Sequence, residues 1–248
     1  GKTVKLLADI NLGDAEAEND PDLIFYPIGY WNSEETYEKN PNATEGVSSG
    51  FYAFQGIFDG NGNTISNFYQ NTWEMKGDHD WYDAKLQYYR DGMGLFGKIL
   101  GGTVKNLTVD NFSCDSEIGT SGVIASYADS KDGNPAVFEN ITITNCNPRV
   151  YNIGNGGIVG CAGWYSRNES LGNKDYTNAV VFRNITVDQT NKISALWGSW
   201  GVSCAGILGQ YYPDSDCGIK LENCHVAAII DVNNDVCSNY QYYWYRYA

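Results

Sequence analysis

Two short patterns of apolar and polar residues alternate along the chain. The first has the form apolar-x-Asn-apolar, as in Val104-Lys105-Asn106-Leu107, and the second is a glycine followed by two apolar residues, as in Gly94-Leu95-Phe96. The first pattern centres on Asn67, Asn106, Asn140, Asn184 and Asn223, and the second begins at Gly56, Gly94, Gly122, Gly157 and Gly206. Strict alternation of two patterns at a regular spacing indicates a repeat architecture.

The predicted inward face of the chain changes at each asparagine. The apolar residue two positions before Asn140 shares its parity, whereas Ile141 and Ile143 after it have the opposite parity. A strand whose alternation changes phase must bend or bulge, and asparagine tolerates left-handed backbone better than most residues. We therefore expect a corner between two short strands, with stacked units aligning the five asparagines into one inward-facing, structural ladder of amides.

These patterns resemble the GLUG-type repeats of bacterial surface proteins. The similarity is carried by segments 54–65, 94–97 and 104–109 and extends over roughly residues 50 to 230. That family occurs in large adhesin-like proteins and in the stalks of IgA-cleaving metalloproteases. The resemblance implies an all-β fold, a right-handed parallel β-helix with long loop insertions and capped ends.

The repeat divides the chain into three parts of a single β-solenoid domain, residues 1–248. Residues 1–50 are expected to form an N-terminal cap with entry strands, since segment 4–12 has the pattern of a strand. Residues 51–230 hold the five-unit repeat, and the aromatic segment 231–248 is expected to be a C-terminal cap or a junction. The chain is interpreted as a fragment of a larger protein that continues into other domains.

Composition and charge narrow the choice of partners and compartment. Acidic residues outnumber basic ones by 30 to 16, and the net charge of −14 repels nucleic acid and anionic lipid. The sequence has no apolar stretch long enough to insert into a membrane. An extracellular or cell-surface location is expected. Seven cysteines, all at or after residue 114, are compatible either with disulfides or with reduced thiols in the core.

Long insertions between the repeat elements carry many aromatic residues. Long loops on a rigid scaffold are the usual carriers of binding, and aromatic rings suit sugar stacking or a protein epitope. The candidate ligand-binding residues are Trp73, Trp81, Tyr82, Trp164, Tyr165, Trp197, Trp200, Tyr211 and Tyr212. The alternative is that these rings form small satellite cores that hold the loops.

The sequence contains few residues that could act in catalysis or bind a metal. There are two histidines, His79 in a polar loop and His225 in a core-like strand, and there is no HExxH motif. We expect no cofactor. Calcium is the cation that the weak metal candidates Asp78, Asp80, Asp129, Asp132, Asp214 and Asp216 would suit, although a polar turn explains each of them as well.

The sequence favours a non-catalytic recognition or adhesion module that binds a host or environmental glycan or protein. One alternative is a passive spacer or stalk of a larger surface protein or protease. A second is a β-helix polysaccharide lyase or glycosidase, although no pair of facing carboxylates is evident in the repeat strands. Asn106, Asn140 and Asn184 also lie in glycosylation sequons, and their expected inward orientation argues against modification there.

Overall fold

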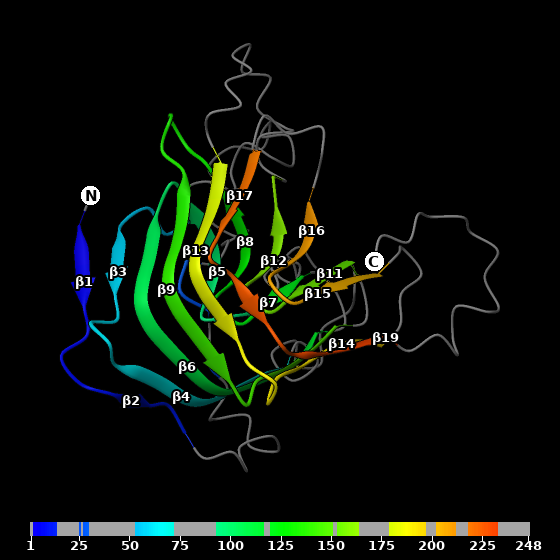
Figure 1. The fold of residues 1–248 in the computed structure, drawn as a ribbon. Coiled ribbons are helices and arrows are strands. Elements are labelled where there is room, and N and C mark those ends of the chain that lie inside the picture. The colour runs from blue at the N-terminus through cyan, green and yellow to red at the C-terminus, as the bar shows by residue number, and fades with distance from the viewer. Residues whose placement is uncertain are drawn as a thin grey trace, which may run out of the picture.

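The computed structural model describes residues 2–13, 25, 27–29, 53–71, 93–116, 120–150, 153–163, 179–196, 202–211 and 218–232. Within these ranges the fold is all-β, contains no helix, and consists mainly of parallel sheets (Figure 1). The predicted all-β class is therefore confirmed. The expected C-terminal cap falls almost wholly outside the described residues, which end at residue 232.

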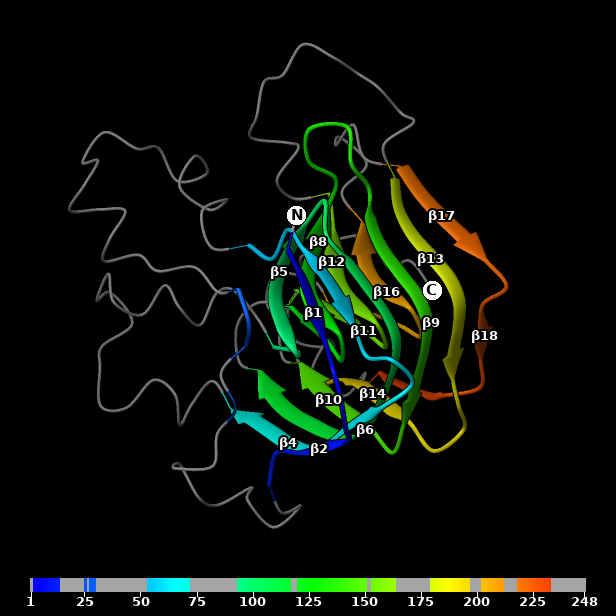
Figure 2. The same cartoon turned by 90° about the vertical axis from the view of Figure 1, so that its left-hand side faces the viewer.

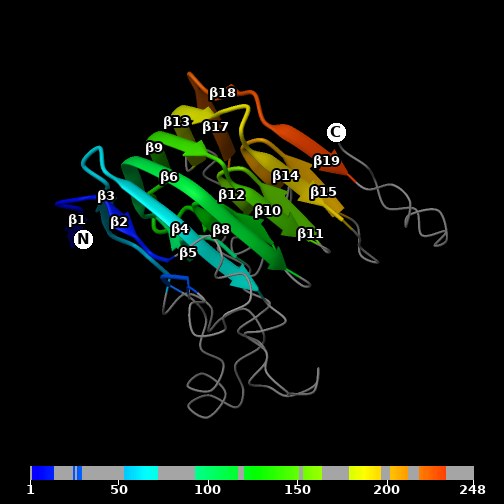
Figure 3. The same ribbon diagram turned by 90° about the horizontal axis from the view of Figure 1, so that it is seen from below.

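The largest sheet has twelve strands, and every pairing between them is parallel. Its strands are β1 (Thr3–Lys5), β2 (Ile10–Asn11), β3 (Ile57–Asp59), β4 (Thr64–Asn71), β6 (Thr103–Ser116), β9 (Ala136–Thr144), β10 (Asn147–Val150), β13 (Ala179–Val187), β14 (Lys192–Ala195), β17 (Gly218–Glu222), β18 (His225–Val226) and β19 (Ile229–Val232). Figure 1 shows β1, β3, β6, β9, β13 and β17 side by side, and Figure 3 shows β4, β6, β10, β14 and β19 side by side.

Two smaller parallel sheets complete the fold. The three-stranded sheet holds β7 (Ser121–Gly122), β11 (Ile153–Gly156) and β15 (Val202–Ala205). The four-stranded sheet holds β5 (Phe96–Leu100), β8 (Ala125–Asp129), β12 (Val159–Ala162) and β16 (Leu208–Tyr211). The chain passes through all three sheets in turn, as in β9, β10, β11 and β12, and then returns to the first sheet as β13 beside β9. Equivalent residues of successive units are therefore neighbours in space.

Left-handed asparagines explain why the strands of the first sheet bend. Asn106, Asn140, Asn184 and Asn223 all have φ between 52° and 54°. In β9 the buried positions are Ala136 and Phe138 before the corner and Ile141 and Ile143 after it, so the inward face does change at the asparagine. A residue in the left-handed region breaks the strict alternation of side chains and turns the strand.

A second corner follows the first, and it corrects the expected alignment. Asn67, Asn111 and Asn145 also have positive φ, of 54° to 57°. Because Ser66 pairs with Asp110 and Phe68 with Phe112, Asn67 lies beside Asn111 and not beside Asn106. The sequence pattern placed all five predicted asparagines at one corner because the elements around Asn67 and Asn106 look alike.

Glycines form a third turn, between the second and third sheets. Here backbones come so close that a side chain has no room: a Cβ on Gly156 would lie 1.9 Å from the carbonyl oxygen of Val159. A Cβ on Gly157 would lie 2.0 Å from the carbonyl oxygen of Gly206. The glycine elements of the sequence therefore mark positions of close backbone approach between neighbouring units.

The core consists of the inward-facing side chains, aligned into columns by the parallel register. Phe138 pairs with Phe182 and with Val104, and all three are fully buried. The rings of Phe138 and Phe182 stack with their centroids 5.2 Å apart. Stacking of like side chains along a column provides both apolar burial and favourable ring contacts.

The predicted entry strand of segment 4–12 is present, although it is broken into β1 and β2. These strands pair with β3 and β4 at one end of the first sheet, and β17, β18 and β19 lie at the other end (Figures 1 and 2). Within the described residues, no helix is long and apolar enough to cross a membrane.

Candidate interaction face

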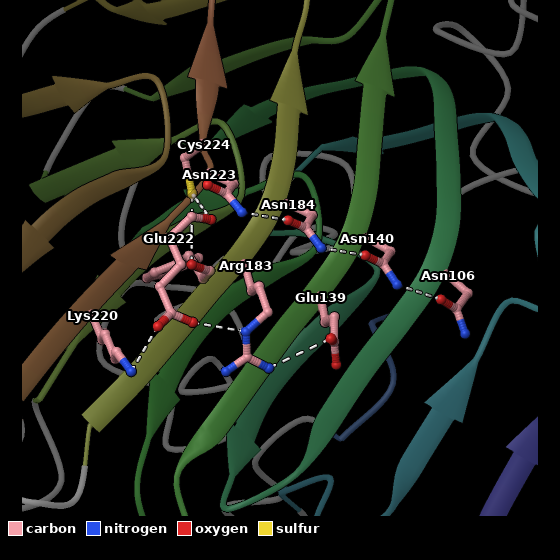
Figure 4. A network of polar contacts seen from close by, with 10 residues as sticks. Asn106, Glu139, Asn140, Arg183, Asn184, Lys220, Glu222, Asn223 and Cys224 are labelled. Carbon is pink, nitrogen blue, oxygen red and sulfur yellow. Dashed lines mark hydrogen bonds and ion pairs between the residues drawn. The ribbon is translucent and has the colours of Figure 1, made fainter.

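The outer surface of β6, β9, β13 and β17 carries a ladder of asparagine side chains (Figure 4). Nδ2 of each asparagine donates to Oδ1 of the one before it: Asn140 to Asn106 over 2.8 Å, Asn184 to Asn140 over 2.8 Å, and Asn223 to Asn184 over 3.3 Å. At the start of this ladder, Asn106 donates to Oδ1 of Asp59 over 3.0 Å. Each bond joins residues 34 to 47 positions apart in the chain.

The ladder lies on the outside of the corner and not, as expected, inside it. Asn140, Asn184 and Asn223 are exposed, and Asn106 is half-buried. A left-handed residue changes the phase of the strand, which lets the apolar residues on both sides of it point inward while its own side chain points out. The expected inward orientation of Asn106, Asn140 and Asn184 was therefore wrong.

A second, shorter ladder occupies the second corner. Asn67 donates to Asn11 over 3.1 Å, and Asn111 donates to Asn67 over 2.8 Å. Asn145 leaves this pattern, because its Nδ2 donates to a carboxylate oxygen of Asp110 over 2.7 Å. Two parallel amide ladders therefore fix the register of neighbouring units on either side of a short strand segment.

A row of charged side chains runs beside the first ladder, one residue earlier in each strand. The parallel register aligns Lys5, Asp59, Lys105, Glu139, Arg183 and Glu222. The sign of the charge alternates at every step of this row. Opposite charges directly across neighbouring strands stabilise their pairing, whereas like charges there would weaken it.

Arg183 forms ion pairs with both of its neighbours in this charged row (Figure 4). Its Nε lies 2.7 Å from Oε2 of Glu222, and its Nη1 lies 3.4 Å from Oε1 of Glu139. Lys220 approaches Glu222 from the same strand, and its Nζ lies 2.7 Å from Oε1 of that residue. Towards the other end, Nζ of Lys105 lies 3.8 Å from Asp59.

These contacts shift the ionisation of the row. The pKa of Asp59 is lowered by the hydrogen bond from Asn106, then by that from the backbone of Asn61, with smaller contributions from nearby lysines. The pKa of Glu222 is lowered by its hydrogen bonds from Lys220 and Arg183. Arg183 has a raised pKa because Glu222 and Glu139 both stabilise its charged form. Asp59, Arg183 and Glu222 therefore stay ionised at neutral pH.

Threonines form another outward row on the same face. Thr64, Thr108, Thr142 and Thr186 align across β4, β6, β9 and β13, and His225 of β18 continues the row. The threonines are half-buried and His225 is exposed. His225, which the sequence places in a core-like strand, is itself exposed, because Cys224 and Val226 have the inward parity at this corner.

The predicted aromatic ligand-binding residues fall mostly outside the described ranges. Trp73, Trp81, Tyr82, Trp164, Tyr165, Trp197, Trp200 and Tyr212 all lie outside them. Tyr211, the last residue of β16, is described: it is 37 % exposed and pairs with Ala162. The structure therefore describes the strands that precede these residues in the chain, and not the residues themselves.

The segments that contain these aromatic residues follow strands that belong to the same sheets. Segments 72–92, 117–119, 151–152 and 197–201 follow β4, β6, β10 and β14, which are neighbours in the first sheet. Val150 pairs with both Ser116 and Ala195 near the ends of these strands. Segments 164–178 and 212–217 follow β12 and β16, which are neighbours in the four-stranded sheet. Insertions of different length thus start from two fixed corners of the scaffold.

The described acidic metal candidates take part in a polar turn. Asp132 has φ of 50° and is followed by Gly133 with φ of 80°, in a hairpin turn closed by two backbone hydrogen bonds between Lys131 and Asn134. Asp129 is buried, and its carboxylate accepts from the backbone of Ser130 over 2.8 Å. Over the described ranges, no group of three or more metal-ligating side chains converges. Asp78, Asp80, Asp214 and Asp216 lie outside those ranges.

Five of the seven cysteines are described, and all five are free thiols. Cys114, Cys146 and Cys161 are buried. Burial raises the pKa of Cys114 and of Cys146 to about 12, and it raises that of Cys161 well above its ordinary value. Of the two interpretations of the cysteines, disulfides or reduced thiols, the structure supports reduced thiols for the five that it describes.

One buried charge has no counterpart in the sequence-based expectations. Lys98 of β5 is 2 % exposed, and its Nζ lies 6.0 Å from the ring centroid of Tyr127, its register partner in β8. A contact of this kind between a cation and an aromatic face is favourable. The sequence pattern gave no signal for it, because every residue of β5 and of β8 is buried, whichever face it lies on.

Comparison of the chain with protein-family models, curated proteins and solved structures gave no match.

Proposed function

We propose that this chain is a non-catalytic recognition or adhesion module of the GLUG-repeat type, displayed outside the cell. Its scaffold would be a right-handed parallel β-helix, and the aromatic insertions would contact a glycan or a protein. The observation that carries the proposal is the alignment of the insertions. Segments 72–92 and 197–201, which contain Trp73, Trp81, Trp197 and Trp200, follow β4 and β14 of the first sheet, and β6 and β10 lie between these two strands.

The contacts between the described strands support separate roles for the scaffold and for the insertions that would bind a ligand. Hydrogen bonds between side chains, charge pairs and aromatic stacking join each unit to the next along the whole scaffold. A scaffold held in this way tolerates insertions of different length, because each insertion begins and ends at strands that are paired independently of it. Binding residues on such insertions can vary while the scaffold stays the same.

Binding arrays of glycans and host proteins, probed with the full chain, test the proposal. We expect a saturable ligand, and we expect Trp81→Ala or Trp164→Ala to weaken its binding at least tenfold, since aromatic anchors dominate interface energies. Thr142→Ser, on the outer face of β9, is the control and should bind as the wild type does. A ligand whose affinity is unchanged in both tryptophan variants would contradict the proposed site.

A passive spacer is the second candidate, and one observation favours it. The asparagines of the two ladders bond to one another, and Arg183 pairs with both Glu139 and Glu222, so these groups on the outer face find partners within the scaffold itself. A spacer should bind nothing saturably on either array. The same experiment therefore separates the two functions, and incubation with neutral and acidic polysaccharides, followed by a search for new chain ends, tests the enzymatic alternative.

A further inference from the structure

Both ends of the first sheet expose side chains that belong to the interior of the fold. In β1, Val4 is 48 % exposed, and in β17, Leu221 is 57 % exposed. Ile10 of β2 and Val226 of β18 are also exposed, at 36 % and 41 %. Edge strands with exposed apolar side chains are templates for pairing with another strand.

These exposed residues are the two ends of the same buried columns. One column runs through Val4, Phe58, Val104, Phe138, Phe182 and Leu221. Another runs through Ile10, Ile65, Val109, Ile143, Val187 and Val226. Between the ends, every member of both columns is at most 5 % exposed. Each column therefore has an exposed apolar residue at both ends, one on β1 or β2 and one on β17 or β18. Placing β1 and β2 of another copy beside β17 and β18 would continue both columns in register.

The charged row has ends of opposite sign. It begins at Lys5 and finishes at Glu222, with the sign alternating at each step between them. Placing Lys5 of a second copy beside Glu222 would continue that alternation, and it would set Val4 beside Leu221 in the adjoining column. Pairing two like ends would not continue this alternation, because both rows would then end in the same sign of charge.

We propose that the end formed by β17 and β18 binds β1 and β2 of a second copy of this chain, head to tail, as the next parallel unit. The register is Val4 on Leu221, Lys5 on Glu222, and Ile10 on Val226. Because this contact joins two different surfaces, it leaves one end of each kind open and builds an open linear assembly, not a closed dimer.

Sedimentation velocity of the full chain over a range of concentrations tests this arrangement. The wild type should form species that grow with concentration. Val4→Asp blocks one end and Leu221→Asp blocks the other, so each variant alone should lose every species above the monomer. A mixture of the two variants retains one intact pair of ends, because Leu221 of the first meets Val4 of the second. That mixture should form a dimer and nothing larger.

Thr142→Asp is the matched control, since it adds the same charge on the outer face in the middle of the sheet and should assemble like the wild type. Lys5→Glu and Glu222→Lys provide a test that spares the core: each alone should weaken assembly, and the double variant should recover it. A wild type that remains monomeric at every concentration overturns the proposal. So does a mixture of Val4→Asp and Leu221→Asp that stays monomeric or grows beyond a dimer.

Discussion

Asn184 donates its side-chain amide to Oδ1 of Asn140 over 2.8 Å, although the two residues are 44 positions apart in the chain. Both have left-handed backbone, and both lie at the same corner of successive units. The contact therefore combines two requirements that few residues meet: a backbone that tolerates positive φ, and a side chain that both donates and accepts.

Substitution of Asn140 separates these two requirements. Asn140→Gly keeps the left-handed backbone and removes the bonds to Asn106 and Asn184, so we expect a loss of about 1–2 kcal/mol in the free energy of unfolding. Asn140→Ala removes the same bonds and adds left-handed strain, so it should cost about 1 kcal/mol more than the glycine variant. Urea denaturation measures both values, and an alanine variant as stable as the glycine variant would show that the strain is absent.

Phe138 tests the contribution of the buried columns. It is fully buried, and its ring stacks on that of Phe182. Phe138→Ala should lower the free energy of unfolding by about 3–5 kcal/mol, because it removes apolar contact and leaves a cavity. Phe138→Leu retains most of the volume and serves as the control. Equal stability of the two variants in urea denaturation would argue against tight packing at this position.

Asp59 should make the stability depend on pH in the acid range. Its folded pKa is lowered below the ordinary value of 3.8, first by the hydrogen bond from Asn106. A depressed folded pKa stabilises the protein fully above the unfolded pKa, and this contribution is lost as the pH falls through the folded pKa. The stability difference between the wild type and Asp59→Ala should therefore shrink as the pH falls below about 3.8. A difference that stays constant down to full protonation would contradict the shift.

The buried thiols should be unreactive in the native protein. A pKa raised from 9.0 to about 12 for Cys114 and Cys146 reduces their thiolate fraction near neutral pH by roughly three orders of magnitude. Mass spectrometry after brief iodoacetamide treatment, resolved by peptide, should find both residues unmodified in the native chain. Both should be modified once guanidinium unfolds it. Rapid native labelling of Cys146 would show that its surroundings open readily.

Much of the scaffold was predictable because side-chain parity is a local signal. The change of inward face around Asn140 is visible in the sequence alone, and the structure confirms it in the buried positions of β9. The side of the corner on which the asparagine itself points was not predictable in this way. It depends on the backbone conformation at φ of 54°, which reverses the orientation expected from simple alternation.

The charged row was missed although the sequence contains its signal. Lys105, Glu139, Arg183 and Glu222 each stand directly before a corner asparagine, and their signs alternate from one repeat to the next. The alternation has meaning only when the repeats are stacked in parallel and in register, since that brings these residues side by side. By contrast, the two asparagine corners cannot be told apart from local pattern, and this is why Asn67 was assigned to the wrong ladder.

The direction of the asparagine ladders has an electrical consequence. In both ladders each hydrogen bond runs from Nδ2 of one asparagine to Oδ1 of the residue in the preceding unit, from Asn223 back to Asp59 and from Asn111 back to Asn11. Amide dipoles of about 3.5 D that are aligned in this way add to one another and do not cancel. The side chains thus give the outer face a permanent polarisation along the direction in which the units follow one another, with its negative pole at the unit of Asn223.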